Sequence, residues 1–360
     1  MRKNNRTLTI LQTVAPGYRE RFFDYLHLVF KKNFSLFAGN EYFDESIKTR
    51  LNKPYFKKIR NVYLFKRRLL LQLDFWKEIL SSEVLVLELN PRILTNWLFL
   101  ILRKLLRGKK TVVWGHAWPR SGMYSKSDRL RNIMRKLADE IIVYTKTQAE
   151  ELKSKMPRKK IKYAPNALYY KNEIHIDRNI LDPKHIIYVG RLVRSKKPLI
   201  LLKAFDSIKN KLPSNVKLLI VGDGPERKKI ENYIVENNLG NRVILLGYIG
   251  DYSMLKRLYH KSLFSVSPGY VGLSIIQSFS FGVPMIISKD EPHSPEIEAA
   301  IEGLNSIFFN TDSIEDLSKK MIEIFSDKHW ISFSTRYKIC KFCRDNYSIE
   351  KMAKSFLELI

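Results

Sequence analysis

One segment of the chain carries the most suggestive chemistry, Tyr188-Val-Gly-Arg-Leu-Val-Arg-Ser-Lys-Lys-Pro198. A short apolar strand, Ile186–Val189, is predicted to stop at Gly190, and Arg191 and Lys196 follow before the closing proline opens a helical pattern. Open α/β folds bind ligands at the carboxyl ends of their parallel strands. An arginine offers a planar fork of donors and a lysine a mobile point charge, which together suit a diphosphate. Solvated surface charge is the weaker interpretation, because both cations lie between a strand and a helix.

Polar residues also follow two predicted strands of the first half. His116 comes after Thr111–Trp114, where it either faces a ligand or is satisfied by the backbone. Asn90 and Arg92 come after Val84–Leu89, where a ligand-binding role and a purely structural turn are equally open.

The elements that would position these residues alternate along the chain. The predicted strands are Leu8–Val14, Val84–Leu89, Thr111–Trp114, Ile141–Tyr144, Ile186–Val189, Val216–Val221, Val243–Leu246, Leu263–Val266 and Val283–Ile287. The predicted helices are Tyr18–Phe30, Trp97–Leu106, one after Tyr144 that Thr147 could cap, one opened by Pro198, one between Glu226 and Asn238, Met254–His260, Leu273–Phe281, Pro295–Ile301 and Ile349–Leu359. This alternation predicts an α/β fold with parallel sheets covered by helices.

The chain has 360 residues, enough for two hydrophobic cores. We expect an N-terminal Rossmann-like domain over residues 1–168, a linker over 169–183 and a C-terminal Rossmann-like domain over 184–335. Helices over 336–360 are expected to pack back toward the N-terminal domain. A ligand at the carboxyl edges of both sheets would lie in a cleft between the domains.

Motifs of the second half resemble those of retaining GT-B glycosyltransferases of family 4. They are Val189-Gly-Arg-Leu with Lys196, Leu219-Ile-Val-Gly-Asp-Gly-Pro-Glu226, Leu246-Gly-Tyr248, and Gly272-Leu with Gly282-Val-Pro284. The first half matches more loosely, through Tyr18-Arg19 and Trp114-Gly-His116. The resemblance implies a GT-B architecture, two Rossmann-like domains facing across a cleft, and transfer of a sugar from a nucleotide-sugar to a hydroxyl with retained anomeric configuration.

The resemblance also implies roles for particular residues. Arg191 and Lys196 would hold the donor diphosphate and neutralise the leaving group, so neither a metal ion nor another cofactor is expected. His116 would contact the donor sugar. The other implied donor-site positions are Gly17, Gly190, Gly222, Gly247, Tyr248, Gly272, Leu273, Ser274 and Gln277, and the candidates for the acceptor or the cleft are Arg19, Asn90 and Arg92.

Three loops carry most of the implied donor-site positions. The amides of Gly272, Leu273 and Ser274 open a predicted helix, and free amides at a helix start can bind an anion. The loop at Gly247 and Tyr248 would face the base. Gly222-Asp-Gly224 resembles a dinucleotide loop without its third glycine, so a tight turn without phosphate contact is equally open.

The chain departs from the family pattern at one motif. Two glutamates separated by seven residues usually flank the Gly-Leu turn, and here those positions are Gly269 and Gln277. Gln277 can still bond a ribose hydroxyl, whereas Gly269 has no side chain. We hypothesise that Glu296 supplies a compensating carboxylate from a nearby helix start.

Charge is distributed unevenly. Residues 1–180 hold 38 Lys/Arg against 16 Asp/Glu, a net charge of +22, whereas residues 181–360 hold 26 against 20, a net charge of +6. The basic half interleaves cations with bulky apolar groups at Phe22–Phe34, Phe65–Leu71 and Trp97–Lys110. Such a pattern favours association with an anionic membrane surface, and the alternative is a core helix with solvated charges.

A cytosolic location is predicted from the few cysteines and from the lack of a recognisable signal or membrane-spanning segment. Cys340 and Cys343 have the spacing of half a zinc site, but no second pair lies near them in sequence, so we interpret them as incidental thiols in a reducing cytosol. Met1–Ala15 is interpreted as a first strand rather than a secretory signal, and no run reaches the ~18 apolar residues of a spanning helix.

These observations predict a cytoplasmic enzyme that is peripheral on the inner face of a bacterial cytoplasmic membrane. Its donor would be a UDP-sugar, with a GDP-sugar as the alternative, and its acceptor a lipid-linked, lipopolysaccharide or capsule saccharide. One alternative is a nucleic-acid-binding protein, although no nucleic-acid module is visible and no such partner is expected. Another is a non-catalytic nucleotide-sugar binder that assists a second transferase, and a sugar-nucleotide epimerase is a further one.

Overall fold

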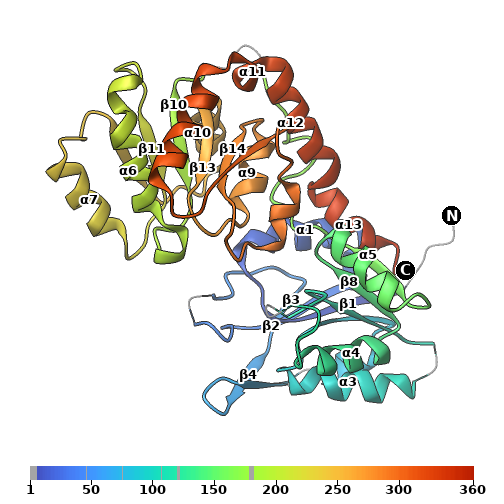
Figure 1. The fold of residues 1–360 in the computed structure, drawn as a ribbon. Coiled ribbons are helices and arrows are strands. Elements are labelled where there is room, and N and C mark those ends of the chain that lie inside the picture. Colours follow the sequence, from blue (N-terminus) through green and yellow to red (C-terminus); the bar gives the residue numbers. More distant parts are fainter. Residues whose placement is uncertain (1–5, 46, 75, 107, 120–121, 178–181) are drawn as a thin grey trace. The chain divides into compact units, whose positions relative to one another are not determined.

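The computed structural model describes residues 6–45, 47–74, 76–106, 108–119, 122–177 and 182–360, which divide into two compact units (Figure 1). The first unit comprises residues 1–168 with 349–360, and the second comprises residues 169–348. The predicted linker over 169–183 differs from this division, because its described part belongs to the second unit. There the ring of Tyr169 lies 5.1 Å from that of Tyr252 and 5.4 Å from that of Phe281.

Seven parallel strands of the described residues form the sheet of the first unit, in the order β3-β2-β1-β6-β7-β8-β9. Their bounds are β1 Leu8–Val14, β2 Phe34–Gly39, β3 Phe56–Lys58, β6 Val84–Glu88, β7 Lys110–Trp114, β8 Glu140–Val143 and β9 Lys160–Tyr163. The central strands are buried on both faces, as expected of a parallel sheet covered by helices. The predicted strands β1, β6, β7 and β8 are confirmed, while β2, β3 and β9 were not predicted.

An antiparallel hairpin stands beside this sheet. It consists of β4 Arg60–Leu64 and β5 Leu69–Leu73, which pair along their whole length. β4 is half-buried or exposed along its length, whereas β5 is rich in leucine and buries Leu70 and Gln72. Neither strand was predicted from the sequence.

Six parallel strands of the described residues form the sheet of the second unit, in the order β12-β11-β10-β13-β14-β15. Their bounds are β10 His185–Val189, β11 Leu218–Val221, β12 Val243–Gly247, β13 Ser262–Ser267, β14 Met285–Ser288 and β15 Ser306–Phe309. The order reverses between β10 and β13, which makes the carboxyl ends of these neighbours the expected ligand site of such a sheet.

Helices cover both sheets. Their bounds are α1 Glu20–Phe30, α2 Trp76–Ser81, α3 Leu94–Lys104, α4 Asp128–Leu137, α5 Lys146–Lys155, α6 Pro198–Ile208, α7 Arg227–Glu236, α8 Tyr252–His260, α9 Ser274–Ser280, α10 Ile314–Ser326, α11 Lys328–Ile331, α12 Phe333–Asn346 and α13 Ile349–Leu357. The short 3-10 turns are η1 Gly17–Arg19, η2 Lys31–Asn33, η4 Arg194–Lys196, η5 Lys209–Lys211 and η6 Pro295–Ala299. The predicted helix over Pro295–Ile301 is therefore a 3-10 turn.

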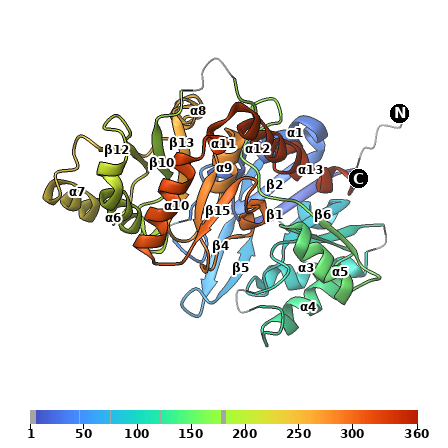
Figure 2. The same ribbon diagram turned by 45° about the horizontal axis from the view of Figure 1, so that its top comes forward.

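Packing and capping explain several of these helices. The helices α6 and α10 lie side by side against one face of the second sheet, in one core cluster with its strands (Figure 2). Helix α5 is capped by Thr145, whose hydroxyl accepts from the amide of Gln148, so the predicted cap at Thr147 was wrong by two residues. The thiols of Cys340 and Cys343 are buried and both contact α9, at the carbonyls of Ser280 and Ile276 respectively.

The last helix of the chain belongs to the first unit. The ring of Phe356 in α13 lies 5.0 Å from that of Phe22 and 5.0 Å from that of Trp114. Helix α12, by contrast, packs on α9 in the second unit. The predicted return of the terminal helices thus applies to 349–360 but not to 336–348.

Candidate functional site

Three loops of the second unit converge at the carboxyl ends of β10, β13 and β14, which are neighbours in the sheet. The amino group of Lys196 donates to the carbonyl of Tyr270 at 2.6 Å and lies 4.6 Å from the centre of its ring. A Cβ atom placed on Gly272 would be 3.8 Å from the Lys196 amine and 3.5 Å from the Ser294 hydroxyl. The structure therefore brings together residues that are far apart in sequence.

Lys196 is half-buried at this point, whereas Arg191 is exposed. Burial, followed by the neighbouring charge of Arg191, lowers the pKa of Lys196 to about 8, and the Glu296 carboxylate opposes this shift. The loop is fixed by Tyr188, whose hydroxyl donates to the carbonyl of Arg191 at 3.0 Å. Two cations are thus held close together beside a strand end, an arrangement that favours binding of an anion with two or more charges.

The loop after β14 supplies residues that the sequence interpretation overlooked. His293 accepts from the amide of Val271 at 2.9 Å through Nδ1, and its Nε2 lies 2.8 Å from the carbonyl of Ser288. These partners require a neutral imidazole with the proton on Nε2, and burial lowers the pKa of His293 accordingly. Ser294 donates to the carboxylate of Glu296, which is only 6% exposed. The same strand-end reasoning that selected Arg191 applies to His293.

Two glycines hold the neighbouring loops close together. Gly222 has φ +143°, and a Cβ there would lie 1.9 Å from the carbonyl oxygen of Gly190. Gly224 has φ +152°, and its Cβ would lie 2.5 Å from the carbonyl oxygen of Leu192. These glycines allow two backbone loops to pack closely, and phosphate contact by Gly222-Asp-Gly224 stays a prediction.

The altered glutamate positions have different surroundings. At Gly269 a Cβ would lie 2.5 Å from the carbonyl oxygen of Ser195, so the backbone that carries Lys196 occupies the space a side chain would need. Gln277 accepts from the hydroxyl of Tyr259 at 3.3 Å and donates to that of Tyr169 at 3.1 Å. Gly269 is therefore required by packing, whereas Gln277 takes part in a network of phenols.

The remaining positions assigned to the donor lie at the start of α9, at the end of the edge strand β12, and in the first unit. Leu273 is the N-cap of α9 and Ser274 its first residue. Gly247 ends β12 with φ +69°, and Tyr248 after it is 78% exposed. Gly17 lies in the first unit, where a Cβ would meet no heavy atom of the described residues within 4 Å.

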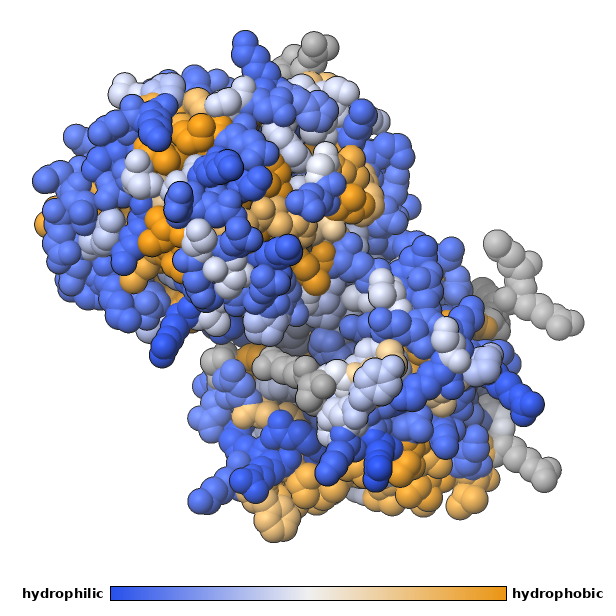
Figure 3. Space-filling view, viewed as in Figure 1, coloured by the Kyte–Doolittle hydropathy of each residue, from blue (hydrophilic) through white to orange (hydrophobic). Residues whose placement is uncertain are grey.

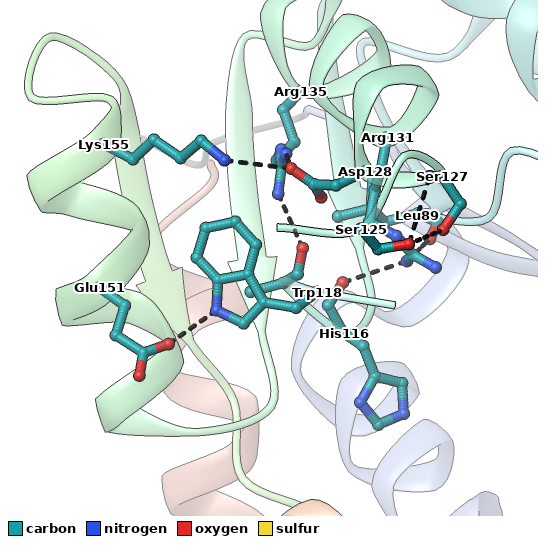
Figure 4. A network of polar contacts seen from close by, with 11 residues as sticks. Leu89, His116, Trp118, Ser125, Ser127, Asp128, Arg131, Arg135, Glu151 and Lys155 are labelled. Atoms are coloured by element: carbon teal, nitrogen blue, oxygen red, sulfur yellow. Dashed lines mark hydrogen bonds and ion pairs between the residues drawn. The ribbon is translucent and has the colours of Figure 1, made fainter. Parts of the chain in front are cut away.

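In the first unit His116 follows β7, and its backbone is held by helix α4 (Figure 4). Arg131 donates to the carbonyls of Leu89 at 2.7 Å and His116 at 3.2 Å, and Arg135 donates to that of Ala117 at 2.7 Å. The imidazole of His116 points away from this network (Figure 4). The network thus fixes the loop while the exposed ring is turned outward.

Arg19 was expected to face an acceptor or a cleft, but its guanidinium is buried. It donates to Gln12 at 3.2 Å and to the hydroxyl of Tyr144 at 3.0 Å, and it lies 4.5 Å from the centre of the Trp114 ring. The ring of Tyr144 in turn lies 4.8 Å from that of His116. Arg19 therefore has a structural role, and the ring of its partner Tyr144 packs beside His116.

Glu88, which the sequence interpretation missed, ends β6 near Arg19. Its half-buried carboxylate accepts from the amide of Thr13 at 2.5 Å and from the hydroxyl of Thr13 at 2.9 Å. Burial raises the pKa of Glu88, although both bonds from Thr13 and the charge of Arg19 oppose the shift. Its place at the end of an apolar strand was the signal that could have identified it.

Asn90 and Arg92 form a turn. The amide oxygen of Asn90 accepts from the backbone of Arg92 at 3.2 Å. The guanidinium of Arg92 donates to the carbonyls of Arg68 at 2.8 Å and Arg67 at 2.6 Å, and it lies 3.7 Å from the centre of the Phe43 ring. Of the two roles left open for these residues, the structure supports the structural one.

Known proteins resemble this chain in sequence over its second half and in fold over its whole length. Residues 171–340 match the family model described as Glycosyl transferases group 1. An uncharacterized glycosyltransferase of Methanocaldococcus jannaschii is 30% identical over 214 residues, which are 54% of this chain and 51% of that protein. A Campylobacter jejuni enzyme is 31% identical over 175 residues, 48% of this chain and 47% of that protein, and its name is GalNAc-alpha-(1->4)-GalNAc-alpha-(1->3)-diNAcBac-PP-undecaprenol alpha-1,4-N-acetyl-D-galactosaminyltransferase.

The chain spans about half the length of these curated relatives. Over its whole length it resembles the solved structure of HepE from Anabaena in complex with UDP, with a TM-score of 0.68, 13% identity, and coverage of 98% of this chain and 99% of that one. The chain therefore has the α/β fold of GT-B glycosyltransferases, with a parallel-sheet domain in each unit, and residues 171–340 match Glycosyl transferases group 1.

Proposed function

We propose that this protein is a retaining glycosyltransferase that moves a sugar from a nucleotide diphosphate sugar to a saccharide acceptor. The observation that carries the proposal is the pair Arg191 and Lys196 at the switch point of the second sheet, with the Lys196 amine held against the loop of Tyr270 and Gly272. The match of residues 171–340 to a glycosyltransferase family supports the same interpretation.

The chemistry follows from the charges. As the bond between the sugar's anomeric carbon and the diphosphate breaks, negative charge grows on the leaving diphosphate. Arg191 offers paired N–H donors and Lys196 a compact charge, so the two can stabilise that oxyanion in the role that a divalent ion plays elsewhere. We therefore propose transfer without a metal ion or another cofactor.

Glu296 is proposed to replace the carboxylate missing at Gly269. It is buried, accepts a bond from Ser294, and is electrostatically coupled to Lys196. It would orient Lys196 or bond a hydroxyl of the donor sugar. On this proposal, Glu296→Gln leaves nucleotide binding in place and slows transfer about tenfold or more, and undiminished transfer would rule the role out.

The donor and acceptor classes are proposed from the relatives. HepE was solved with UDP, which favours a UDP-sugar over a GDP-sugar. The Campylobacter jejuni relative is named for a PP-undecaprenol saccharide, which favours a lipid-linked acceptor of cell-surface polysaccharide synthesis, and therefore a peripheral position at the inner face of a cytoplasmic membrane. His116, exposed on the first unit, is proposed to contact the donor sugar.

A second candidate function is nucleotide-sugar binding without catalysis. Gly269 favours it, because the family carboxylate is absent and the backbone near Ser195 leaves no room for one. Nucleotide binding with no turnover on any acceptor would support this candidate.

The deciding experiment is calorimetric titration of the protein with UDP, GDP and ADP. One nucleotide should bind, and Arg191→Ala and Lys196→Ala should each weaken it about tenfold or more, because each removes a charged donor. Arg194→Ala is the matched control, since that exposed cation lies in the same turn as Lys196. Failure of all three nucleotides to bind, or equal loss in the control, would contradict the proposed function.

A further inference from the structure

The outer face of α3 is apolar although the core does not use it. Its inner face carries the buried residues of the helix, including Phe99 and Leu100. A second stripe is exposed, and its spacing of four, three and four residues places it on one side of the helix. The stripe consists of Leu94, Leu98, Ile101 and Leu105, with exposed fractions of 36%, 37%, 52% and 78%.

This apolar surface continues onto the neighbouring helix. On α4, which contacts α3, Leu130 and Ile133 are about half exposed. Figure 3 shows a band of hydrophobic surface along the lower edge of the first unit, over α3. A contiguous apolar band of this kind is a frequent mark of an interaction surface, whereas single exposed leucines are not.

The tip of the β4–β5 hairpin presents a second apolar group with cations. Phe65 is 72% exposed, and Lys66 and Arg68 beside it are exposed as well. Phe65 and Lys66 have φ values of 49° and 52°, a left-handed conformation that non-glycine residues seldom adopt. The fold therefore holds this aromatic ring outward in a conformation that costs free energy.

The hairpin and α3 are fastened together within the first unit. Leu70 of β5 forms a bridge with Ile93, the N-cap residue of α3. Arg92 donates to the carbonyls of Arg67 and Arg68 in the hairpin turn. The exposed stripe of α3 and the hairpin tip, Phe65 to Arg68, together form what we call the docking face.

Charge indicates what covers the docking face. Residues 60–73 contain four Lys/Arg and residues 91–110 contain six, and neither segment contains Asp or Glu. Some of these cations pair with carboxylates, as Arg67 does with Glu41 and Glu45, whereas Lys66 and Arg68 at the hairpin tip are exposed. Apolar side chains beside exposed cations suit the interface of an anionic bilayer, where the apolar chains enter the acyl boundary and the cations meet the headgroups. A second copy of the chain would bring a net charge of +28 against the same cations.

We propose that the docking face binds the surface of a membrane rich in anionic lipid, which would place the enzyme beside a lipid-linked acceptor if the proposed function holds. The segment Phe22–Phe34, which the sequence also suggested for this role, is not part of the face. Its Phe22, Phe23 and Leu26 are buried in the core. Among the described helices, none has the length and apolar character to cross a bilayer.

The test is co-sedimentation of the full chain with vesicles of phosphatidylcholine containing about one third phosphatidylglycerol, an anionic lipid. Wild-type protein should bind them, and should bind pure phosphatidylcholine vesicles far more weakly. The double variant Ile101→Ser with Leu105→Ser tests the stripe, and Lys66→Glu with Arg68→Glu tests the tip. Each should weaken binding about tenfold or more, since each removes buried apolar area or paired charge.

Matched controls keep the test specific. Leu28→Ser in α1 and Val235→Ser in α7 remove side chains that are 71% and 76% exposed but lie outside the docking face. Both controls should bind like the wild type. Equal loss in Leu28→Ser, no loss in either double variant, or no binding by the wild type would overturn the proposal. Loss of a dimer in the stripe variant without vesicle binding would also overturn it, in favour of a second copy.

Two further measurements separate the possible failures. Unchanged melting temperatures show that the variants remain folded, as expected for exposed positions. Calorimetric nucleotide binding reports on the second unit, so the docking variants should retain it. A failure of the proposed transferase function would appear there, and would leave the vesicle result unaffected.

Discussion

At the scale of single residues, Lys196 is the most informative position. Its amine bonds a backbone carbonyl and lies beside another cation, in a half-buried place where a free lysine would be costly. Binding of an anion would offset both the cost of burying the charged amine and its repulsion with Arg191. The sequence predicted this residue by its place between a strand and a helix, but the lowered pKa depends on burial and on Arg191, which only the structure shows.

The lowered pKa predicts how nucleotide binding depends on pH. Because the pKa of Lys196 is about 8, its cationic form is present below that pH and is lost as pH rises through it. Nucleotide affinity should therefore be steady near neutrality and fall above pH 8, by as much as about tenfold per pH unit. Isothermal calorimetry from pH 7 to 9.5 measures this. Lys196→Arg, which stays charged, should abolish the decline, and identical profiles in both proteins would contradict the assignment.

At the scale of elements, the loops at the strand ends pack backbone against backbone. Gly222 lies against Gly190, and Gly269 lies against the turn η4 that carries Lys196. Sequence periodicity identifies strands and helices, but it says nothing of contacts between loops that are 30 or more residues apart. This is why Gly269 looked like a lost carboxylate in the sequence and is a packing position in the structure.

This packing makes the two altered signature positions respond differently to restoration of glutamate. Gly269→Glu should destabilise the protein by about 3 kcal/mol or more, because its Cβ would clash with backbone, and it should weaken nucleotide binding by displacing Lys196. Gln277→Glu should change stability by less than about 1.5 kcal/mol, since a carboxylate can accept from both Tyr259 and Tyr169. Thermal unfolding and nucleotide titration of both variants test this. Equal stability of the two would show that the loop can move aside.

At the scale of the whole molecule, the chain contributes its last helix to its first unit. Helix α13 packs on α1, and its Ser355 contacts the carbonyl of Tyr163. The amine of Lys110 also donates to the carbonyl of Leu359 at 2.8 Å. The hydrophobic core of the first unit therefore includes side chains of α13.

Removing the central contact of that helix should destabilise the first unit. Phe356 is fully buried against Phe22 and Trp114, so Phe356→Ala should cost about 3–5 kcal/mol through the cavity it leaves. Differential scanning calorimetry should show a lowered transition for the first unit. The exposed Lys354→Ala on the same helix is the control and should leave the transition in place. A matching change in both variants would mean that α13 does not stabilise the core.

The sequence alone determined the fold class, the strands of both sheet centres and the cation pair, because buried parallel strands are continuous apolar runs and their ends must carry the polar groups that meet a ligand. It also indicated the basic first half. Only the tertiary structure decided which aromatic segments are core and which are exposed. It also showed that Arg19 and Arg92 have structural roles, and that His293 and Glu88 lie beside the candidate residues. These outcomes depend on contacts between residues distant in the chain, and no local pattern records them.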